Sequence, residues 1–267
     1  MFNKKKPLRV HVELSNKCNA MCPQCGRNYI DKDGVLKVKP NMQTGELVLE
    51  NYKKVFDDKF YDTFDLQKIN YCGNRSDPIA SKDLHEIVEY AYSKNENTII
   101  TIATNGGLKT TEWWAKFGKM MSSKKHHVVF GLDGLEDTHH IYRQRTNFNK
   151  VISNAKTFIQ NGGRAEWQML VFKHNEHQVE QAKIIAKEIG FTSFKSVFTP
   201  RFYTKEGQKM EFFSFIVLVL IAVFLWRINS QLPDLLFRLS EIQRDISQIK
   251  KVSHPDESTT QSAEKPE

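Results

Sequence analysis

The feature that most constrains the fold is a regular alternation of β-branched runs with amphipathic runs between residues 8 and 202. Each β-branched run is followed by a segment with helical periodicity, so the pattern predicts parallel strands connected by helices that cover the sheet. An open doubly wound sheet and a partial barrel both fit this rhythm. We expect strands at 8–15, 66–73, 98–105, 126–134, 164–172 and 193–202, and helices near 46–59, 81–95, 109–123, 147–161 and 176–189.

The alternation stops after Phe202, where a sixth amphipathic helix does not follow. After a linker at 205–211, the chain has fifteen residues without a charge, from Phe212 to Trp226. A helix of that length spans about 22 Å, which is short of a hydrocarbon core of roughly 30 Å, but flanking basic side chains extend to the head groups. We predict a transmembrane helix at 212–228, with a buried core helix or a signal-like segment as the alternatives.

A heptad pattern follows the apolar run. Aliphatic residues recur from Ile228 to Ile249 at alternating spacings of four and three. This spacing predicts an amphipathic helix at 229–252 that forms a short coiled coil, and hence a homo-oligomer, through 228–249. A single amphipathic helix lying on a surface is the alternative.

The end of the chain lacks apolar anchors, so residues 253–267 are expected to be disordered. Met210 immediately precedes the apolar run, and residues 210–267 read by themselves as a small complete protein. A gene fusion at Met210 is therefore a further hypothesis.

Charge and cysteine content narrow the class of protein. Residues 1–209 carry an excess of ten positive charges, which indicates either an anionic substrate or ordinary solubilising lysines. No dense basic run with interleaved aromatic residues occurs, so we expect no nucleic-acid partner. The N-terminus has no apolar core and is not a signal peptide. Three of the four cysteines lie within eight residues, which indicates metal ligands in a reducing compartment rather than disulfides.

Those three cysteines, Cys18, Cys22 and Cys25, follow a C-x3-C-x2-C spacing. Thiolates favour zinc, copper and iron–sulfur clusters, and a structural zinc site needs four protein ligands. A [4Fe–4S] cluster takes one ligand per iron, so three cysteines leave one iron free to bind a small molecule.

This spacing, directly after the first predicted strand, resembles the cluster loop of the radical S-adenosylmethionine (SAM) superfamily. The resemblance extends over residues 8–200. Asp133-Gly134 followed by His139 and Arg143 is similar to a stretch in the peptide-modifying and molybdenum-cofactor branches. A C-terminal cysteine cluster is lacking, so the resemblance implies no auxiliary iron–sulfur domain.

The resemblance implies a partial (β/α)6 barrel over residues 1–204 that lacks its last helix. It also implies a [4Fe–4S] cluster whose open iron is chelated by the amino and carboxylate groups of SAM. One electron, from a reductant such as flavodoxin or ferredoxin, would cleave SAM to methionine and a 5′-deoxyadenosyl radical. That radical would abstract hydrogen from a peptide or a small molecule. The catalytic domain would then lie on the cytoplasmic side of a single-pass membrane protein.

The family's SAM contacts map onto polar turns at the predicted strand ends. Thr104 and Asn105 also fit a plain βα turn, and Asp133 fits a capping turn. Arg143 is a SAM-carboxylate or substrate partner or a solvated arginine, and Arg145 is able to substitute for it. The implied cofactor-binding residues are Gln24, Gly73, Asn74, Asp77, Thr104, Asn105, Asp133, Arg143 and Asn175.

Two positions depart from the family pattern. Gln24 stands where an aromatic residue often packs near the adenine, and Gly131 stands where serine is frequent. These departures, with the missing last helix, favour a rival hypothesis from another class of protein. The rival is a membrane-anchored coiled-coil interaction protein with a catalytically silent iron–sulfur barrel.

Other candidate ligands keep alternatives open. Cys72 fits a fourth cluster ligand, a thiol radical relay, or a small apolar residue at a strand end. Four histidines fit either a second metal site or solvated and strand-end positions: His126, His127, His139 and His140.

Overall fold

The computed structural model describes residues 5–42, 45–123, 125–198, 230–232 and 236–246. The chain divides into two compact units, Met1–Tyr203 and Thr204–Glu267. The predicted linker, the predicted span at 212–228, Met210 and the predicted disordered tail lie outside the described residues. Within the described ranges, no helix is both long enough and apolar enough to cross a membrane.

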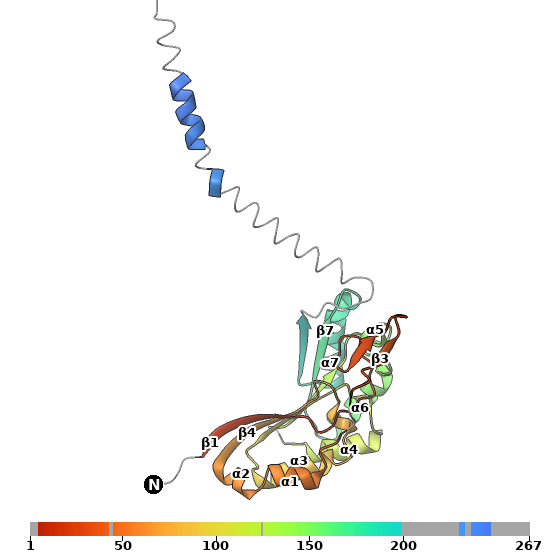
Figure 1. Ribbon diagram of the computed structural model, residues 1–267. Coiled ribbons are helices and arrows are strands. Elements are labelled where there is room, and N and C mark those ends of the chain that lie inside the picture. The colour runs from red at the N-terminus through yellow and green to blue at the C-terminus, as the bar shows by residue number, and fades with distance from the viewer. Residues whose placement is uncertain (1–4, 43–44, 124, 199–229, 233–235, 247–267) are drawn as a thin grey trace, which may run out of the picture. The chain divides into compact units, whose positions relative to one another are not determined.

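The first unit is built on a six-stranded parallel sheet with the order β1-β4-β5-β6-β7-β8. Figure 1 shows its first two strands, β1 and β4, side by side. Strand order follows chain order and every neighbouring pair is parallel, so all the carboxyl ends lie at one edge of the sheet. This confirms the predicted parallel α/β fold, and the order is consistent with a partial barrel. The strands are β1 (Lys6–Val12), β4 (Phe64–Tyr71), β5 (Ile99–Thr104), β6 (His127–Gly131), β7 (Ala165–Val171) and β8 (Ser193–Phe198).

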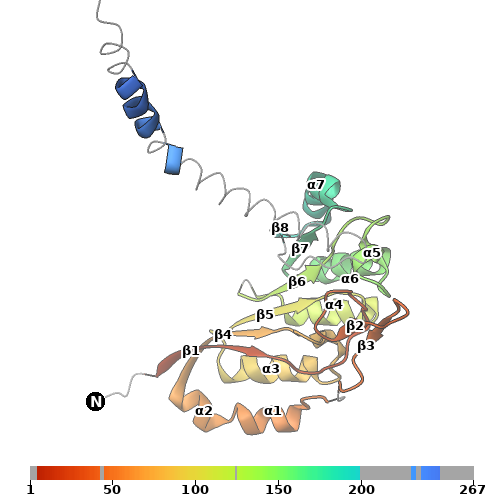
Figure 2. The ribbon, with the colours of Figure 1, turned by 45° about the horizontal axis from the view of Figure 1, so that its top comes forward.

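Helices connect the strands and lie along one face of the sheet, as Figure 2 shows for α3, α4 and α6. Side-chain caps set several starts: Thr110 accepts a hydrogen bond from the Trp113 amide, and Asn147 accepts one from the Lys150 amide. The helices are α1 (Leu49–Val55), α2 (Asp58–Thr63), α3 (Leu84–Lys94), α4 (Thr111–Met120), α5 (His139–Tyr142), α6 (Phe148–Gln160) and α7 (Val179–Ile189), with 3-10 turns η1 (Pro78–Ala80) and η2 (Glu176–Gln178).

The predicted helix at 46–59 is two helices. Asp57 lies between α1 and α2, and its carboxylate accepts a hydrogen bond from the Phe60 amide at 2.8 Å. An aspartate in this position starts a new helix rather than continuing the first. A small antiparallel hairpin, β2 (Asn28–Ile30) with β3 (Leu36–Val38), was not predicted, because three-residue strands carry too little periodicity to detect.

The hydrophobic core lies between the sheet and the helices. It contains a group of contacting aromatic rings in which Trp114 lies 5.2 Å from Phe130 and 5.8 Å from Phe158, centroid to centroid. Strand residues that face this core, such as Phe130 and Trp167, are fully buried. Because side chains alternate along a strand, the intervening residues lie on the opposite face, which we call the inner face of the sheet.

The described part of the second unit is helical at 230–232 and 236–246. Four residues of the predicted heptad seam fall in these ranges and all are exposed: Leu232, Leu239, Ile242 and Ile246. Leu235, Ile228 and Ile249 lie outside the described residues. Pairing through this seam stays a prediction.

Candidate cluster and cofactor site

Cys18, Cys22 and Cys25 lie in the loop between β1 and β2 and line one pocket of about 240 Å³. Cys22 is buried, and the other two are partly exposed. Side chains from the carboxyl ends of the neighbouring strands complete the lining, which is where parallel α/β folds bind ligands.

Backbone hydrogen bonds attach the cysteine loop to two other segments. The Met21 amide donates to the Gln144 carbonyl at 2.9 Å, and the Asp77 amide donates to the Lys17 carbonyl at 2.9 Å. Within the loop, the Asn28 side-chain amide donates to the Cys22 carbonyl at 2.9 Å. The three thiols are therefore held in place by the protein itself.

The environment of the thiols favours their protonated form when no metal is bound. Burial raises the pKa of Cys18 to about 12, and the charge of Asp77 adds to this effect. Burial also raises the pKa of Cys22, although the nearby Arg143 opposes it. A coordinating thiol is deprotonated outright, so loading with iron releases protons.

Asp77 is the centre of a buried hydrogen-bond network. Its carboxylate accepts hydrogen bonds from the Thr104 hydroxyl at 2.8 Å and from the Asn105 amide at 2.7 Å. The Asn105 side chain donates to the same carboxylate, and also to Asn19 of the cysteine loop at 2.9 Å. Burial raises the pKa of the Asp77 carboxyl, whereas these hydrogen bonds lower it, with a net rise. Asp77 thus positions the strand-end turn against the cysteine loop.

Arg143 is a partly buried cation beside the cysteine loop. Its Nε donates to Asp133 Oδ2 at 2.6 Å, and its Nη1 lies 4.0 Å from the Cys22 sulfur. Asp133 is fully buried and its other oxygen accepts the Leu170 amide at 2.6 Å. Burial lowers the pKa of Arg143, but the negative charges of Asp133 and Cys22 outweigh it, so the pKa is raised. Arg143 is therefore not the solvated arginine of the alternative, whereas Arg145 is exposed.

Gly131 ends β6 directly against this guanidinium. A Cβ atom at residue 131 would lie 2.5 Å from Nη2 of Arg143. A serine, which the family often has here, would therefore collide with an arginine that Asp133 holds in place. Gly131 and Arg143 are thus a matched pair.

Six of the nine predicted cofactor-binding residues line the pocket: Gly73, Asn74, Asp77, Thr104, Asn105 and Arg143. Gly73 is required by its own turn, because a Cβ there would lie 2.2 Å from the Ser76 hydroxyl. Gln24, Asp133 and Asn175 do not contribute to the pocket lining.

Those three residues differ in what they contact. Asp133 acts through Arg143. The Asn175 side chain accepts the Phe172 amide at 2.7 Å and donates to the Leu170 carbonyl at 2.9 Å, so its polar atoms hold the turn after β7. Gln24 Oε1 is buried and has no hydrogen-bond partner among the described residues.

Sequence reasoning missed other residues of the pocket, among them Ser76, Tyr142 and Gln168. The Ser76 hydroxyl is buried without a partner among the described residues. Tyr142 packs with Cys22 and Ala20 in a small apolar cluster. Only alternation along β7 pointed to Gln168, and nothing in the sequence singled out the other two.

Cys72 lies at the end of β4 and lines the same pocket, with its sulfur in contact with the His11 imidazole. Burial, followed by the charge of Glu13, raises its pKa to about 11. It is partly buried, and all three of its roles stay open.

The four histidines do not form a metal site in the described ranges, where no group of three or more His, Cys, Asp or Glu side chains is arranged to hold one metal ion. His126 and His139 are buried rather than solvated. The Ile100 amide donates to His126 Nδ1 at 3.2 Å, and His139 Nε2 lies 2.9 Å from the Thr146 hydroxyl. His126 therefore holds a strand end, and His139 anchors α5.

The cysteine pocket fits a cluster better than a single ion. In a [4Fe–4S] cluster each thiolate binds a different iron, so the three sulfurs need not converge on one point. Three soft ligands, a counter-cation at Cys22 and the unpartnered Ser76 hydroxyl in the lining match a cluster with a polar ligand beside it.

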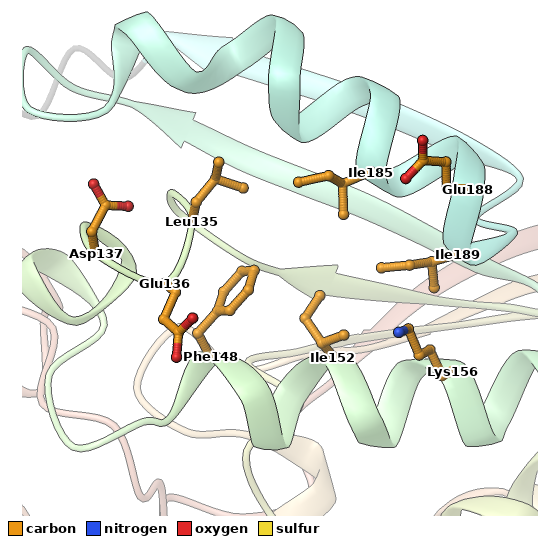
Figure 3. A pocket seen from close by; sticks show the side chains of 9 residues that line it. All are labelled: Leu135, Glu136, Asp137, Phe148, Ile152, Lys156, Ile185, Glu188 and Ile189. Atoms are coloured by element: carbon orange, nitrogen blue, oxygen red, sulfur yellow. The ribbon is translucent and has the colours of Figure 1, made fainter.

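A larger groove of about 560 Å³ lies elsewhere, between α6 and α7 (Figure 3). Phe148 and Ile152 of α6 face Ile185 and Ile189 of α7 across it. The groove contains no cysteine and lies on the helix-covered side of the sheet. Chemistry, rather than size, therefore identifies the cysteine pocket as the candidate site.

Substitution of Gly131 by alanine is expected to destabilise the protein by about 1–3 kcal/mol, because the new Cβ displaces the Arg143 guanidinium from Asp133. Urea denaturation measures the change. The matched control is Gly45→Ala, where nothing lies within 4 Å of the new Cβ; it is expected to change stability by less than about 0.5 kcal/mol. Equal effects of the two variants would contradict the contact.

Stability is expected to fall between pH 7 and 5 because of His139. Burial, helped by the charge of Arg143, lowers the pKa of His139 to about 3. The unfolded chain takes up a proton near pH 6.5 and the folded chain does not, so this contribution is full above pH 6.5 and is lost as the pH falls. The resulting loss in the free energy of unfolding is about 2 kcal/mol at pH 5.

Urea denaturation at the two pH values checks this difference. His139→Gln is expected to make the pH dependence shallower by about that amount, whereas His140→Gln, at the exposed neighbour, leaves it unchanged. An unaltered slope in the His139 variant would show that the acid sensitivity has another source.

Comparison with known proteins identifies one family. The Radical SAM superfamily profile matches residues 12–183. No curated protein matches the chain significantly. Among solved structures, SuiB of Streptococcus suis bound to its precursor peptide SuiA is 16% identical with a TM-score of 0.53, and the match covers 72% of this chain and 39% of SuiB.

Two further structures have the same fold. SuiB bound to S-adenosylmethionine is 17% identical with a TM-score of 0.53, covering 77% of this chain and 41% of that one. The enzyme anSMEcpe with AdoMet and a peptide bound is 17% identical with a TM-score of 0.55, covering 76% and 55%. The matches thus cover from about two fifths to just over half of the length of these neighbours.

Proposed function

We propose, from the premise that this chain belongs to the radical SAM superfamily, that it is an enzyme that generates a radical from SAM and uses it on an organic substrate. The observation that carries the proposal is the convergence of Cys18, Cys22 and Cys25 on one pocket with the polar ends of the parallel strands. The cofactors of this family are a [4Fe–4S] cluster and SAM, as the sequence predicts.

The residues of the pocket have different proposed roles. The three thiolates would hold the cluster, which when reduced supplies the electron that cleaves SAM. Arg143, fixed by Asp133, presents a positive charge for a carboxylate, and Asn74 lines the same pocket with its carbonyl 3.8 Å from the Cys25 sulfur. Gln24 lies in the cysteine loop outside the pocket lining, and its buried oxygen has no partner among the described residues. The apolar cluster around Tyr142 excludes water from Cys22.

The test is anaerobic reconstitution with iron and sulfide, followed by reduction with dithionite in the presence of SAM. We expect methionine and 5′-deoxyadenosine in equal amounts, measured by chromatography, and neither when dithionite is omitted. A chain that assembles the cluster but forms no 5′-deoxyadenosine would instead support the silent-barrel alternative. That alternative is not favoured, because Gly131 is matched to Arg143, which lines the pocket beside Cys22.

The substrate is proposed to be a peptide or a small molecule. SuiB binds a precursor peptide, and the present chain matches only part of that protein. Incubation with SAM and candidate peptides under turnover conditions, with mass spectrometry of the product, separates the two classes.

The C-terminal region supports a further proposal about location. The uncharged stretch from Phe212 to Trp226 is proposed to anchor the enzyme through 212–228 as a single-pass protein, with the catalytic domain in the cytoplasm near flavodoxin or ferredoxin. The heptad at 228–249 is proposed to pair two copies. Carbonate extraction of membranes tests the anchor: the full chain should remain in the pellet, and a chain ending at residue 209 should not.

A further inference from the structure

Two basic side chains lie side by side on the inner face of the sheet, at a distance from the cysteine loop. Arg9 of β1 is in register with Lys68 of β4. The register shifts between Leu8 and Arg9, so Gln67 is an extra residue and β4 contains a bulge there. Leu66 is in register with Leu8, before the bulge. A bulge reverses the alternation of side chains, so this one turns Lys68 from the helix-covered face to the inner face.

The positive charges of Arg9 and Lys68 are not neutralised by ion pairs within the described part of the chain. Two acids lie near the cluster, and neither pairs with Arg9 or Lys68: Glu166, whose charge reaches His127, pairs with Lys195 at 2.9 Å, and Glu13 accepts the Asn74 side chain at 2.9 Å. Like charges directly opposite each other destabilise a sheet. This arrangement therefore costs stability in the free protein and is relieved by an anion.

A row of polar side chains lies next to this pair. His11, Asn70, Thr101 and His127 are in register across four adjacent strands. Thr101 Oγ1 lies 3.4 Å from His127 Nε2. Burial lowers the pKa of His127, the charge of Glu166 opposes this, and Lys68 is close enough for its charge to lower the pKa further. The inner basic cluster, which we define as Arg9, His11, Lys68 and His127, is thus one connected surface.

This cluster faces the same interior as the cofactor pocket. Cys72 lines that pocket and follows Asn70 by two residues and Lys68 by four. At about 3.3 Å per residue, Asn70 lies about 7 Å and Lys68 about 13 Å further along the strand. A small molecule or a peptide terminus spans that distance while its other end reaches the pocket.

We propose that the inner basic cluster binds an anionic group of the substrate, a carboxylate or a phosphate, whose reacting end lies in the cofactor pocket. The proposal rests on the function proposed above, because it assigns the substrate class of that site. Guanidinium and ammonium groups are the common protein partners of both anions. Asn70 and Thr101 supply neutral donors between the two histidines.

The test uses the full chain with isotope-labelled histidines and inorganic phosphate as the probe, at low ionic strength. Nuclear magnetic resonance signals of His11 and His127, assigned by single substitution, are expected to shift saturably with phosphate. Lys68→Gln is expected to weaken the apparent affinity at least about tenfold. The matched control, Lys59→Gln, removes an exposed lysine from α2 and should leave the affinity unchanged.

Additional ligands and variants distinguish the possible outcomes of this experiment. If acetate or phosphate binds more tightly, the anion is assigned to a carboxylate or a phosphate source respectively. No saturable shift, an equal shift with sodium chloride at matched ionic strength, or unchanged binding in the Lys68 variant would overturn the proposal. Arg9→Gln provides the same test if circular dichroism shows that the Lys68 variant does not fold. Phosphate binding needs neither SAM nor reductant, so its failure is distinct from failure of the radical chemistry.

Discussion

Replacement of Cys22 by alanine is expected to abolish SAM cleavage, lowering 5′-deoxyadenosine formation by at least about 100-fold. Cys22 is the most buried of the three thiols and packs against Ala20 and Tyr142. Its removal takes a ligand from the cluster and leaves the Arg143 cation beside an apolar methyl group. Iron and sulfide per chain should fall with the activity, because a cluster with two protein ligands is not retained.

Cys72→Ala is the matched control, because Cys72 lines the same pocket outside the three-cysteine loop. Iron content and visible absorption are measured after anaerobic reconstitution of both variants. We expect the Cys72 variant to keep the cluster. Loss of iron in that variant would make Cys72 a fourth ligand and would remove the open iron on which SAM binding depends.

The sheet was predictable because its strands and helices carry strong periodicity. All six strands of the sheet were predicted; β-branched residues are buried in β1, β4, β5, β6 and β7, whereas β8 has no buried residue and was predicted from its place in the alternation. The bulge at Gln67 was not predicted, because one extra residue leaves the composition of the strand unchanged. Its effect is nevertheless large, since it decides which face Lys68 occupies. Register is a property of paired strands and is not contained in one strand's pattern.

The site was predictable as far as local motifs reach. The cysteine spacing and the polar strand ends identified the pocket, but the partners of Asp133 depended on contacts distant in sequence. Asp133 meets Arg143 ten residues later and the Leu170 amide of another strand. Such contacts separate a residue that touches a ligand from one that positions its neighbour.

The two departures from the family pattern have physical explanations of different kinds. Gly131 removes a side chain where a guanidinium needs the space, so the loss of one polar contact accompanies the gain of a charge beside Cys22. Gln24 replaces ring stacking with a single buried acceptor. The first exchange places a fixed cation next to a cluster ligand, and charge near the sulfurs is one of the factors that set the potential of such clusters.

Substitution of Asp77 by asparagine is expected to destabilise the protein by about 3 kcal/mol and to weaken SAM binding. The carboxylate is fully enclosed and accepts hydrogen bonds from Thr104, Asn105 and the Ile79 amide. An amide in its place turns one acceptor into a donor that faces the Asn105 donors. The turn at Thr104 and Asn105 then loses its anchor, and so does the contact of Asn105 with Asn19 in the cysteine loop.

Two measurements distinguish positioning from a general loss of folding. Asp57→Asn makes the same chemical change at an exposed helix cap, where asparagine serves as well as aspartate, and should alter stability by less than about 0.5 kcal/mol. SAM affinity, measured by equilibrium dialysis of the folded, cluster-loaded variant, should fall for Asp77→Asn and not for Asp57→Asn. Unchanged SAM affinity in a destabilised Asp77 variant would restrict this carboxylate to a structural role, because the strand-end turn would then hold its place without it.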